Sequence, residues 1–310
     1  MIFTATLNQM VFLFLLIAVG YFLAKKNFVP ENAEKALSKL ENYLFIPALV
    51  MGTFMTNFTQ DKLLGAKNIL IGSFIIEMLV IPVSIICVKL ASKDKYIQNI
   101  YLYGLSFANF GFVGNAIVSK IFPDIFLEYL IFTLVLWIAI YLWGVPVLLM
   151  GDSDKKISIK ARLKNFLNPM LICMVIGMVI GILNIPVPSF ATNLVTSLGD
   201  CMSPIAMLLT GMTIARTRLS EILKHKSIYP ITFLRLIVYP LIFIFMTKFI
   251  DMSETLKICA LSSLAMPLGL NTVVIPAGLG KDTRVASGMA LVSHFFACIT
   301  IPIMFSLLSL

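Results

Sequence analysis

Two stretches of this sequence place asparagine beside glycine or proline within otherwise apolar segments. They contain Asn109, Gly111, Gly114 and Asn115 in the first stretch, and Pro267, Gly269 and Asn271 in the second. Glycine and proline interrupt helices, and an interrupted membrane helix exposes N–H groups at one end and carbonyls at the other. These ends carry partial charges and can hold an anion or a cation without a charged side chain.

The asparagines are the candidate ligands of these breaks, because an amide both donates and accepts hydrogen bonds. Asn115 and Asn271 are 156 positions apart, and the same shift places Leu105 on Leu261. Paired interruptions at matching places in two halves point to a transporter's binding site. We predict a substrate site at Asn109, Gly114, Asn115, Pro267, Gly269 and Asn271, with Arg235 attracting an anion. The alternative is that the asparagines only satisfy the broken backbone.

Three charged residues lie within apolar segments. They are Glu77, Asp200 and Arg235, each about nine residues into its segment. Such charges are rare in membranes and normally face a cavity or a partner. One interpretation is a structural ion pair, Asp200–Arg235 or Glu77–Arg235. The other is that a carboxylate binds the coupling proton or ion while Arg235 attracts an anion.

One histidine and two prolines complete the set of candidate residues. His294 lies in the last apolar segment, where it serves either as a proton relay or as hydrogen-bonded structure. Pro47 and Pro204 are expected to kink their helices around the site. The sequence contains no P-loop, no hydrolase nucleophile motif and no cluster of metal ligands. We therefore expect no enzyme activity, no catalytic residue, no metal and no cofactor.

The composition indicates the element that must position these residues, the membrane helix. The chain has 310 residues, of which 59% are hydrophobic and 13% charged, whereas soluble domains carry about 25% charged residues. The mean hydropathy is +0.98. The five cysteines lie in apolar runs without C-x-x-C spacing and are interpreted as small buried residues. We predict an all-α, multi-pass membrane protein whose first segment, 5–24, is retained.

Ten segments of about 20 apolar residues can span the bilayer. They are 5–24, 35–56, 67–90, 98–120, 124–150, 167–185, 191–215, 227–249, 254–279 and 284–308. Lys and Arg in the connecting loops divide 18 to 5 between the two sides. The basic side is cytoplasmic by the positive-inside rule, so both termini are predicted to lie outside the cytoplasm. The net charge of +9 thus reports membrane topology and not a nucleic-acid partner.

Five segments in each half imply an inverted repeat, because an odd number turns the second half upside down. The predicted division is a first repeat at 1–150, a basic cytoplasmic linker at 151–166 and a second repeat at 167–310. Pro146 and Pro302 also match at a shift of 156. Breaks at equivalent places in oppositely oriented halves are expected to cross near the middle of the membrane, within segments 4 and 9.

The chain resembles the auxin efflux carrier family of bacterial permeases, which includes malate-permease-like proteins and is related to plant auxin exporters. The resemblance covers essentially the whole chain. It rests on the motifs at 42–49, 109–114, 168–169, 198–206, 266–267 and 301–302. It implies ten helices in two inverted repeats, an elevator-like movement and small organic carboxylates as substrates. Ala116 departs from the family pattern, since many relatives have proline there.

The resulting hypothesis is a secondary active transporter of a small organic anion, a dicarboxylate such as malate or an auxin-like carboxylate. It would work by alternating access in the cell membrane, as a symporter or antiporter driven by protons or Na⁺. The rival classes are a membrane sensor that binds such a ligand without transport and a channel. The substrate, the coupling ion, the direction of transport and the oligomeric state, including a homodimer, stay open.

Overall fold

The computed structural model describes residues 2–30, 32–149, 169–216, 225–278 and 281–308. These residues form helices and no strand. Among them, six helices are long and apolar enough to cross a membrane: Phe3–Lys25, Gly65–Ala91, Pro123–Leu149, Ser189–Ala215, Ile228–Met246 and Arg284–Leu308. The other expected segments correspond to shorter or interrupted helices. The linker expected at 151–166 lies outside the described residues.

The first half of the chain contains α-helices, short π-helices and one 3₁₀ turn. In order they are α1 (Ile2–Lys25), α2 (Ala33–Leu40), π-helix η1 (Glu41–Phe45), α3 (Ile46–Asn57), α4 (Gln60–Ala91), α5 (Lys95–Ser106), π-helix η2 (Phe110–Gly114), α6 (Asn115–Ile121), 3₁₀ turn η3 (Pro123–Ile125), α7 (Phe126–Ala139) and π-helix η4 (Ile140–Leu149).

The second half begins at α9 and contains one further π-helix. Its elements are α9 (Pro169–Ile182), α10 (Ser189–Asp200), α11 (Met202–Ala215), α13 (Ile228–Phe233), π-helix η5 (Leu234–Val238), α14 (Tyr239–Met246), α15 (Glu254–Leu264), α16 (Asn271–Gly278) and α17 (Arg284–Leu308).

Proline accounts for several of the π-helical segments. η1 ends two residues before Pro47, η5 ends two residues before Pro240, and η4 contains Pro146. Proline lacks an N–H and its ring crowds the carbonyl four residues earlier, so the preceding turn widens. Pro204, the other predicted kink, is the third residue of α11, just after the chain leaves α10. The interruptions therefore follow local sequence chemistry.

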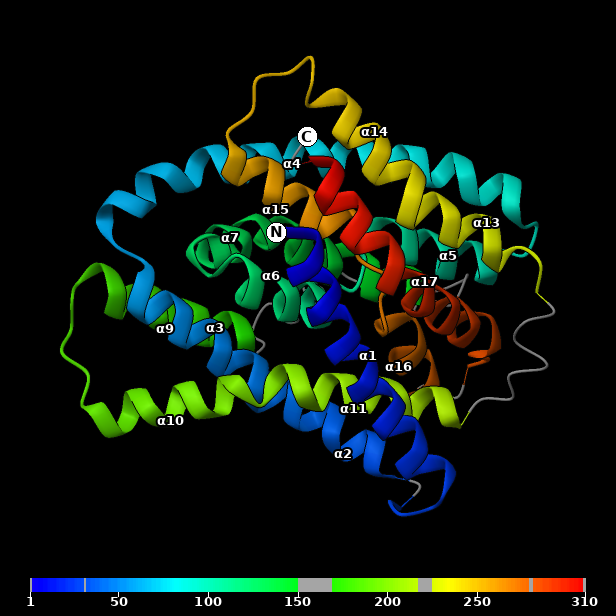
Figure 1. Ribbon diagram of the computed structural model, residues 1–310, viewed down its shortest axis with the longest axis horizontal. Helices are drawn as coiled ribbons and strands as arrows, with labels where there is room; N and C mark the ends of the chain where they lie inside the picture. Colours follow the sequence, from blue (N-terminus) through cyan, green and yellow to red (C-terminus); the bar gives the residue numbers. More distant parts are fainter. Residues whose placement is uncertain (1, 31, 150–168, 217–224, 279–280, 309–310) are drawn as a thin grey trace.

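The helices pack as two groups that meet along a central seam (Figure 1). One group contains α2, α3, α9, α10 and α11, with α10 and α11 running across the lower half of the view above α2. The other contains α4 to α7 and α13 to α17, with α4 running across the upper half. α1 packs against α11 of the first group and α17 of the second. The seam is thus the place where one group faces the other.

Glycines allow very close helix contacts inside the first group. A Cβ atom added at Gly177 of α9 would lie 2.6 Å from the carbonyl oxygen of Met51 in α3. One added at Gly181 would lie 2.6 Å from the carbonyl oxygen of Phe54. Small residues four apart let membrane helices approach backbone to backbone. These glycines therefore let α3 and α9 pack backbone to backbone.

The two helix breaks predicted from the sequence lie side by side. α5 ends at Ser106 and α15 ends at Leu264, and the extended residues that follow form a single antiparallel bridge between Ala108 and Leu268. The N–H of Asn109 donates to the carbonyl of Pro267 over 2.7 Å. After each break the chain begins a second half-helix, which is η2–α6 after the first break and α16 after the second. The backbone polar groups exposed by one break are in part satisfied by the other.

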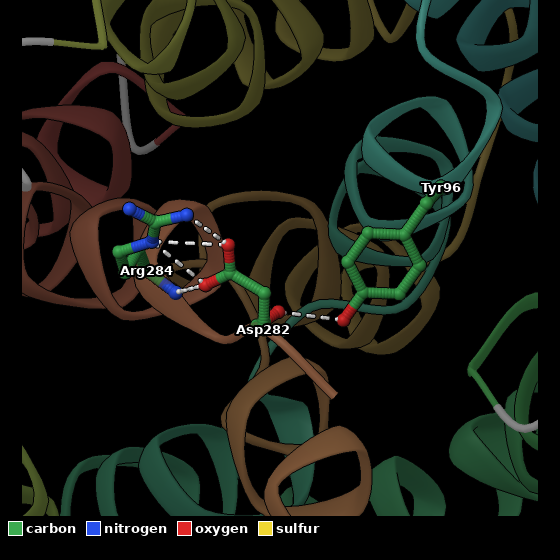
Figure 2. Close-up of polar contacts among 3 residues, drawn as sticks. All are labelled: Tyr96, Asp282 and Arg284. Atoms are coloured by element: carbon green, nitrogen blue, oxygen red, sulfur yellow. Dashed lines mark hydrogen bonds and ion pairs between the residues drawn. The ribbon is translucent and has the colours of Figure 1, made fainter. Parts of the chain in front are cut away.

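The loop before α17 is fixed to the start of α5. Figure 2 shows Asp282, whose carboxylate accepts from the N–H and the guanidinium of Arg284 at the beginning of α17. The hydroxyl of Tyr96 in α5 donates to the backbone carbonyl of Asp282 over 2.7 Å. This contact joins the entry of α17 to the first turn of α5.

Candidate functional site

A cavity of about 330 Å³ lies on the seam, next to the paired breaks. The second group lines it with the backbone from Ala108 to Phe112, with Gly269 to Asn271, and with aromatic residues of α5, α7 and η4. The first group contributes residues of α2, η1, α9 and α11. The cavity is therefore bounded by both groups, so a shift of one group against the other would reshape it.

Asn109 lies at the centre of the site. Its side chain lines the cavity, and its amide nitrogen is 3.0 Å from Nε2 of His294 in α17. Nδ1 of His294 is 2.7 Å from the carbonyl oxygen of Ala290. A carbonyl only accepts, so Nδ1 carries a proton and donates it. Asn109 and His294, both singled out from the sequence, are therefore direct partners.

Asn271, the first residue of α16, also lines this cavity. Its amide nitrogen donates to the hydroxyl of Tyr103 in α5 over 3.0 Å. Tyr103 also lines the cavity and stacks edge-on against Phe107. Asn109 and Asn271 are thus each held by a side chain from a neighbouring helix.

The glycines and the proline of the breaks serve close packing. A Cβ at Gly114 would collide with the hydroxyl of Tyr129, and one at Gly269 would lie 2.9 Å from the carbonyl oxygen of Phe107. Pro267 provides the carbonyl that accepts from Asn109. Of these three residues, Gly269 lines the cavity. Asn115 is buried one turn beyond the break and is not among the residues lining the cavity.

Arg235 connects the two breaks and is not among the residues that line the cavity. Its side chain is 1% exposed. The guanidinium donates to the carbonyl oxygens of Leu105 at 2.7 Å, of Ser263 at 2.6 Å and of Met266 at 3.4 Å. These carbonyls lie at the C-terminal ends of α5 and α15, where helix carbonyls have no intrahelical partner. Arg235 does not line the cavity, so the structure does not place it where it would touch an anion there.

The two ion pairs considered from the sequence are not formed among the described residues. Glu77 of α4 is buried, and its Oε1 has no hydrogen-bond partner in that part of the chain. Asp200 is exposed at the end of α10, where it lines a separate cavity of about 340 Å³ with Asp124 and Lys62. The ion pair Asp200–Arg235 is therefore wrong. Glu77–Arg235 is not a direct contact, because the hydrogen bonds of Arg235 go to carbonyls, but the two charges still interact electrostatically.

Aromatic residues form much of the cavity wall, and the sequence did not predict them as site residues. They are Tyr103, Trp137 and Tyr141, with Tyr43 from the first group. Trp137 packs on Phe110 and stacks on Tyr141. Tyr103 and Tyr141 lie within long apolar runs, where a hydroxyl needs a partner or a cavity. That was the available signal, but the sequence alone does not tell which face of a helix is turned to the seam.

The electrostatic potential in the cavity comes from partial charges of the backbone. None of the described residues that line it is Lys, Arg, Asp or Glu. Two half-helices begin at its wall: the continuous run Phe110–Ile121 and α16 at Asn271. Helix N-termini present unpaired N–H groups and a positive partial charge, which favour an anion. The arrangement can hold a small anion between two helix N-termini, aromatic rings and two amides.

A family profile described as membrane transport protein matches residues 5–305. The chain belongs to this family, the auxin efflux carrier family. The resemblance inferred from the motifs is thereby confirmed, and with it a multi-pass membrane protein of a transporter family. Transporter families are not enzyme families, which agrees with the lack of catalytic motifs.

One relative among the curated proteins is an uncharacterized transporter of Schizosaccharomyces pombe. It is 30% identical over 102 residues, which cover 33% of this chain and 23% of that protein. The match therefore spans less than a quarter of the relative's length, and it supports membrane transport without indicating a substrate.

Proposed function

We propose that this protein carries a small organic carboxylate across the cell membrane, and that the cavity beside the paired breaks is its binding site. The observation that carries the proposal is the meeting of two half-helix N-termini and two asparagines at one cavity. The N-termini would receive the carboxylate. The aromatic wall of Tyr103, Trp137 and Tyr141 would pack against the rest of the substrate.

Alternating access is the mechanism that this arrangement supports best. In the proposed ten-helix topology, the breaks belong to helices 4 and 9 of two inverted repeats, and the termini lie outside the cytoplasm. The cavity residues of α2 and η4 then lie toward the cytoplasmic side. A displacement of the group carrying the breaks along the other group would expose the same site to the opposite side, as in an elevator. The close backbone contact of α3 with α9 suits a fixed frame.

A proton or Na⁺ gradient is the proposed energy source. Glu77 is one candidate for the coupling group, because it is buried and its Oε1 lacks a partner among the described residues. Buried ionisable residues in membrane segments mark ion or proton pathways. Asp200, exposed beside the separate cavity, is a weaker candidate. A stepwise variation of pH and Na⁺ during uptake tests which gradient drives transport.

The test is uptake of labelled malate and of a labelled monocarboxylate by purified protein in liposomes. Wild-type protein should accumulate at least one of them, and Asn109→Ala and Asn271→Ala should reduce uptake at least tenfold, because each removes a polar group of the cavity. Asn115→Ala is the matched control, since Asn115 does not line the cavity. Binding with no transport of any solute would instead favour a sensor, and wild-type uptake in both alanine variants would refute the site.

A further inference from the structure

The hydrogen bonds of His294 determine how Asn109 presents its amide to the cavity. Nδ1 of His294 donates to Ala290, so in the neutral ring Nε2 has a lone pair and can only accept. No carboxylate among the described residues pairs with His294, which is 4% exposed. Burying an isolated charge is costly, so the ring is neutral. Asn109 must therefore offer an N–H to His294, and the opposite orientation of its amide would set two lone pairs against each other.

The carboxamide oxygen of Asn109 then has no hydrogen-bond partner among the described residues. The side chain of Asn109 makes no hydrogen bond other than that to His294 within the described part of the chain. The residue is 3% exposed and lines the cavity. The side-chain amide of Asn271 is oriented in the same way: its nitrogen donates to Tyr103, and its oxygen makes no hydrogen bond in the described residues. A buried acceptor that stays unpaired in a complex weakens that complex.

The surroundings of His294 confirm that its contact with Asn109 is specific. His294 also lines a second, very small cavity. The other residues that line it are Met10, Leu13, Phe14, Ile17, Met207, Val113, Pro267, Ala297 and Cys298. Arg235 of η5, which packs against α17, is bound to the crossover carbonyls. The polar partners of the imidazole in the described chain are Asn109 and Ala290 alone.

We infer that His294 is a positioning residue that turns the Asn109 oxygen to the cavity, and that the substrate is a carboxylate which also carries a hydrogen-bond donor. The inference rests on the proposed transport of a carboxylate and narrows its substrate class. The helix N-termini supply donors for the carboxylate, while Asn109 supplies an acceptor for a hydroxyl or N–H group. A carboxylate without such a group leaves this oxygen unpaired. Sites built for a donor reject analogues that lack it.

The test compares acids that differ in one hydroxyl, lactate with propionate and malate with succinate, each measured as a labelled substrate of uptake at pH 7. Wild-type protein should bind the hydroxylated member of the transported pair about tenfold more tightly or better, measured as KM. His294→Gln places an amide oxygen near the position of Nε2 and should keep the preference. His294→Asn reaches only toward Ala290, so it should reduce the preference below about threefold.

Two further variants keep the result decisive. Phe295→Leu, at an exposed position of the same helix, controls for changes in α17. Asn109→Ser removes the carboxamide oxygen and should also lose the preference. It is the second test should His294→Asn fail to fold, and it is read from ligand-induced thermal stabilisation where uptake is low. Equal KM values within both pairs in wild-type protein, or the same preference in His294→Asn and His294→Gln, would overturn the inference while leaving carboxylate transport intact. Absence of uptake and of ligand-induced thermal stabilisation by all four acids would overturn both.

Discussion

Replacing Arg235 should weaken the whole crossover. The guanidinium donates to carbonyls that end α5 and α15, at 2.7 Å to Leu105 and 2.6 Å to Ser263. The bond to Met266, at 3.4 Å, is too long to add much. Arg235→Met keeps a long apolar stem but leaves these carbonyls without a donor in a buried place. The two half-helix ends would then lose the group that holds them together.

The magnitude follows from the two short bonds. A hydrogen bond to a charged group contributes about 1.5–3 kcal/mol, so the variant should lose roughly 3–6 kcal/mol. For a protein of this size that corresponds to a fall of roughly 5–9 °C in the melting temperature. The measurement is thermal unfolding in detergent, followed by the elution of the folded peak in size-exclusion chromatography. Uptake should fall as well, because the break no longer holds Asn109 in place.

The matched control is Arg216→Met, which breaks a partly exposed ion pair with Glu34 at 3.0 Å. Such pairs contribute about 0–1 kcal/mol, so its melting temperature should change by about 2 °C or less. If Arg235→Met melts within the same range as this control, the carbonyl contacts of Arg235 are not a structural support and the reasoning is wrong.

Four further predictions concern the helix packing, the cavity and the loop before α17. Gly181→Leu should prevent α9 from approaching α3 and reduce the yield of folded protein severalfold in membrane extracts, with Gly65→Leu, which faces open space, as control. Tyr103→Phe should raise the KM for the transported acid about tenfold, because the amide of Asn271 loses its partner. Tyr96→Phe should lower the free energy of unfolding by about 1 kcal/mol in thermal or denaturant unfolding, through loss of its bond to the Asp282 carbonyl. Arg284 lowers the pKa of the Asp282 carboxyl by hydrogen bonding, so its stabilising effect is present above about pH 4 and is lost as the pH falls through the folded-state pKa; Asp282→Asn should flatten this acid dependence of the melting temperature.

The sequence could predict the helical class and the breaks because both follow from local chemistry. A run of apolar residues has few other solutions than a membrane helix, and the clusters around Gly114 and Pro267 are incompatible with an uninterrupted one. The pairing of Asn109 with His294 could not be read from the chain, since it joins residues 185 positions apart. The same is true of Tyr103 and Asn271, whose contact depends on helix rotation.

The charged residues within apolar segments were the least reliable guide to side-chain contacts. Opposite charges in apolar segments suggested ion pairs of Arg235 with Glu77 or Asp200, because side-chain partners are the ones that a sequence displays. The actual acceptors are backbone carbonyls, which every residue has and which become available only where a helix ends. A sequence shows that a helix breaks but not which buried group will approach the broken end.

This placement of Arg235 accounts for the selectivity that we propose. At each break one half-helix ends and another begins, so negative and positive partial charges lie a few residues apart and would largely cancel. Here the ending carbonyls of α5 and α15 are bound by a buried cation, while the beginnings at Phe110 and Asn271 line the cavity. The negative ends are thereby neutralised, and the cavity is left with the positive ones. A cavity without any charged side chain among its described residues can in this way favour an anion, and substitution of Arg235 should weaken anion binding even where the protein still folds.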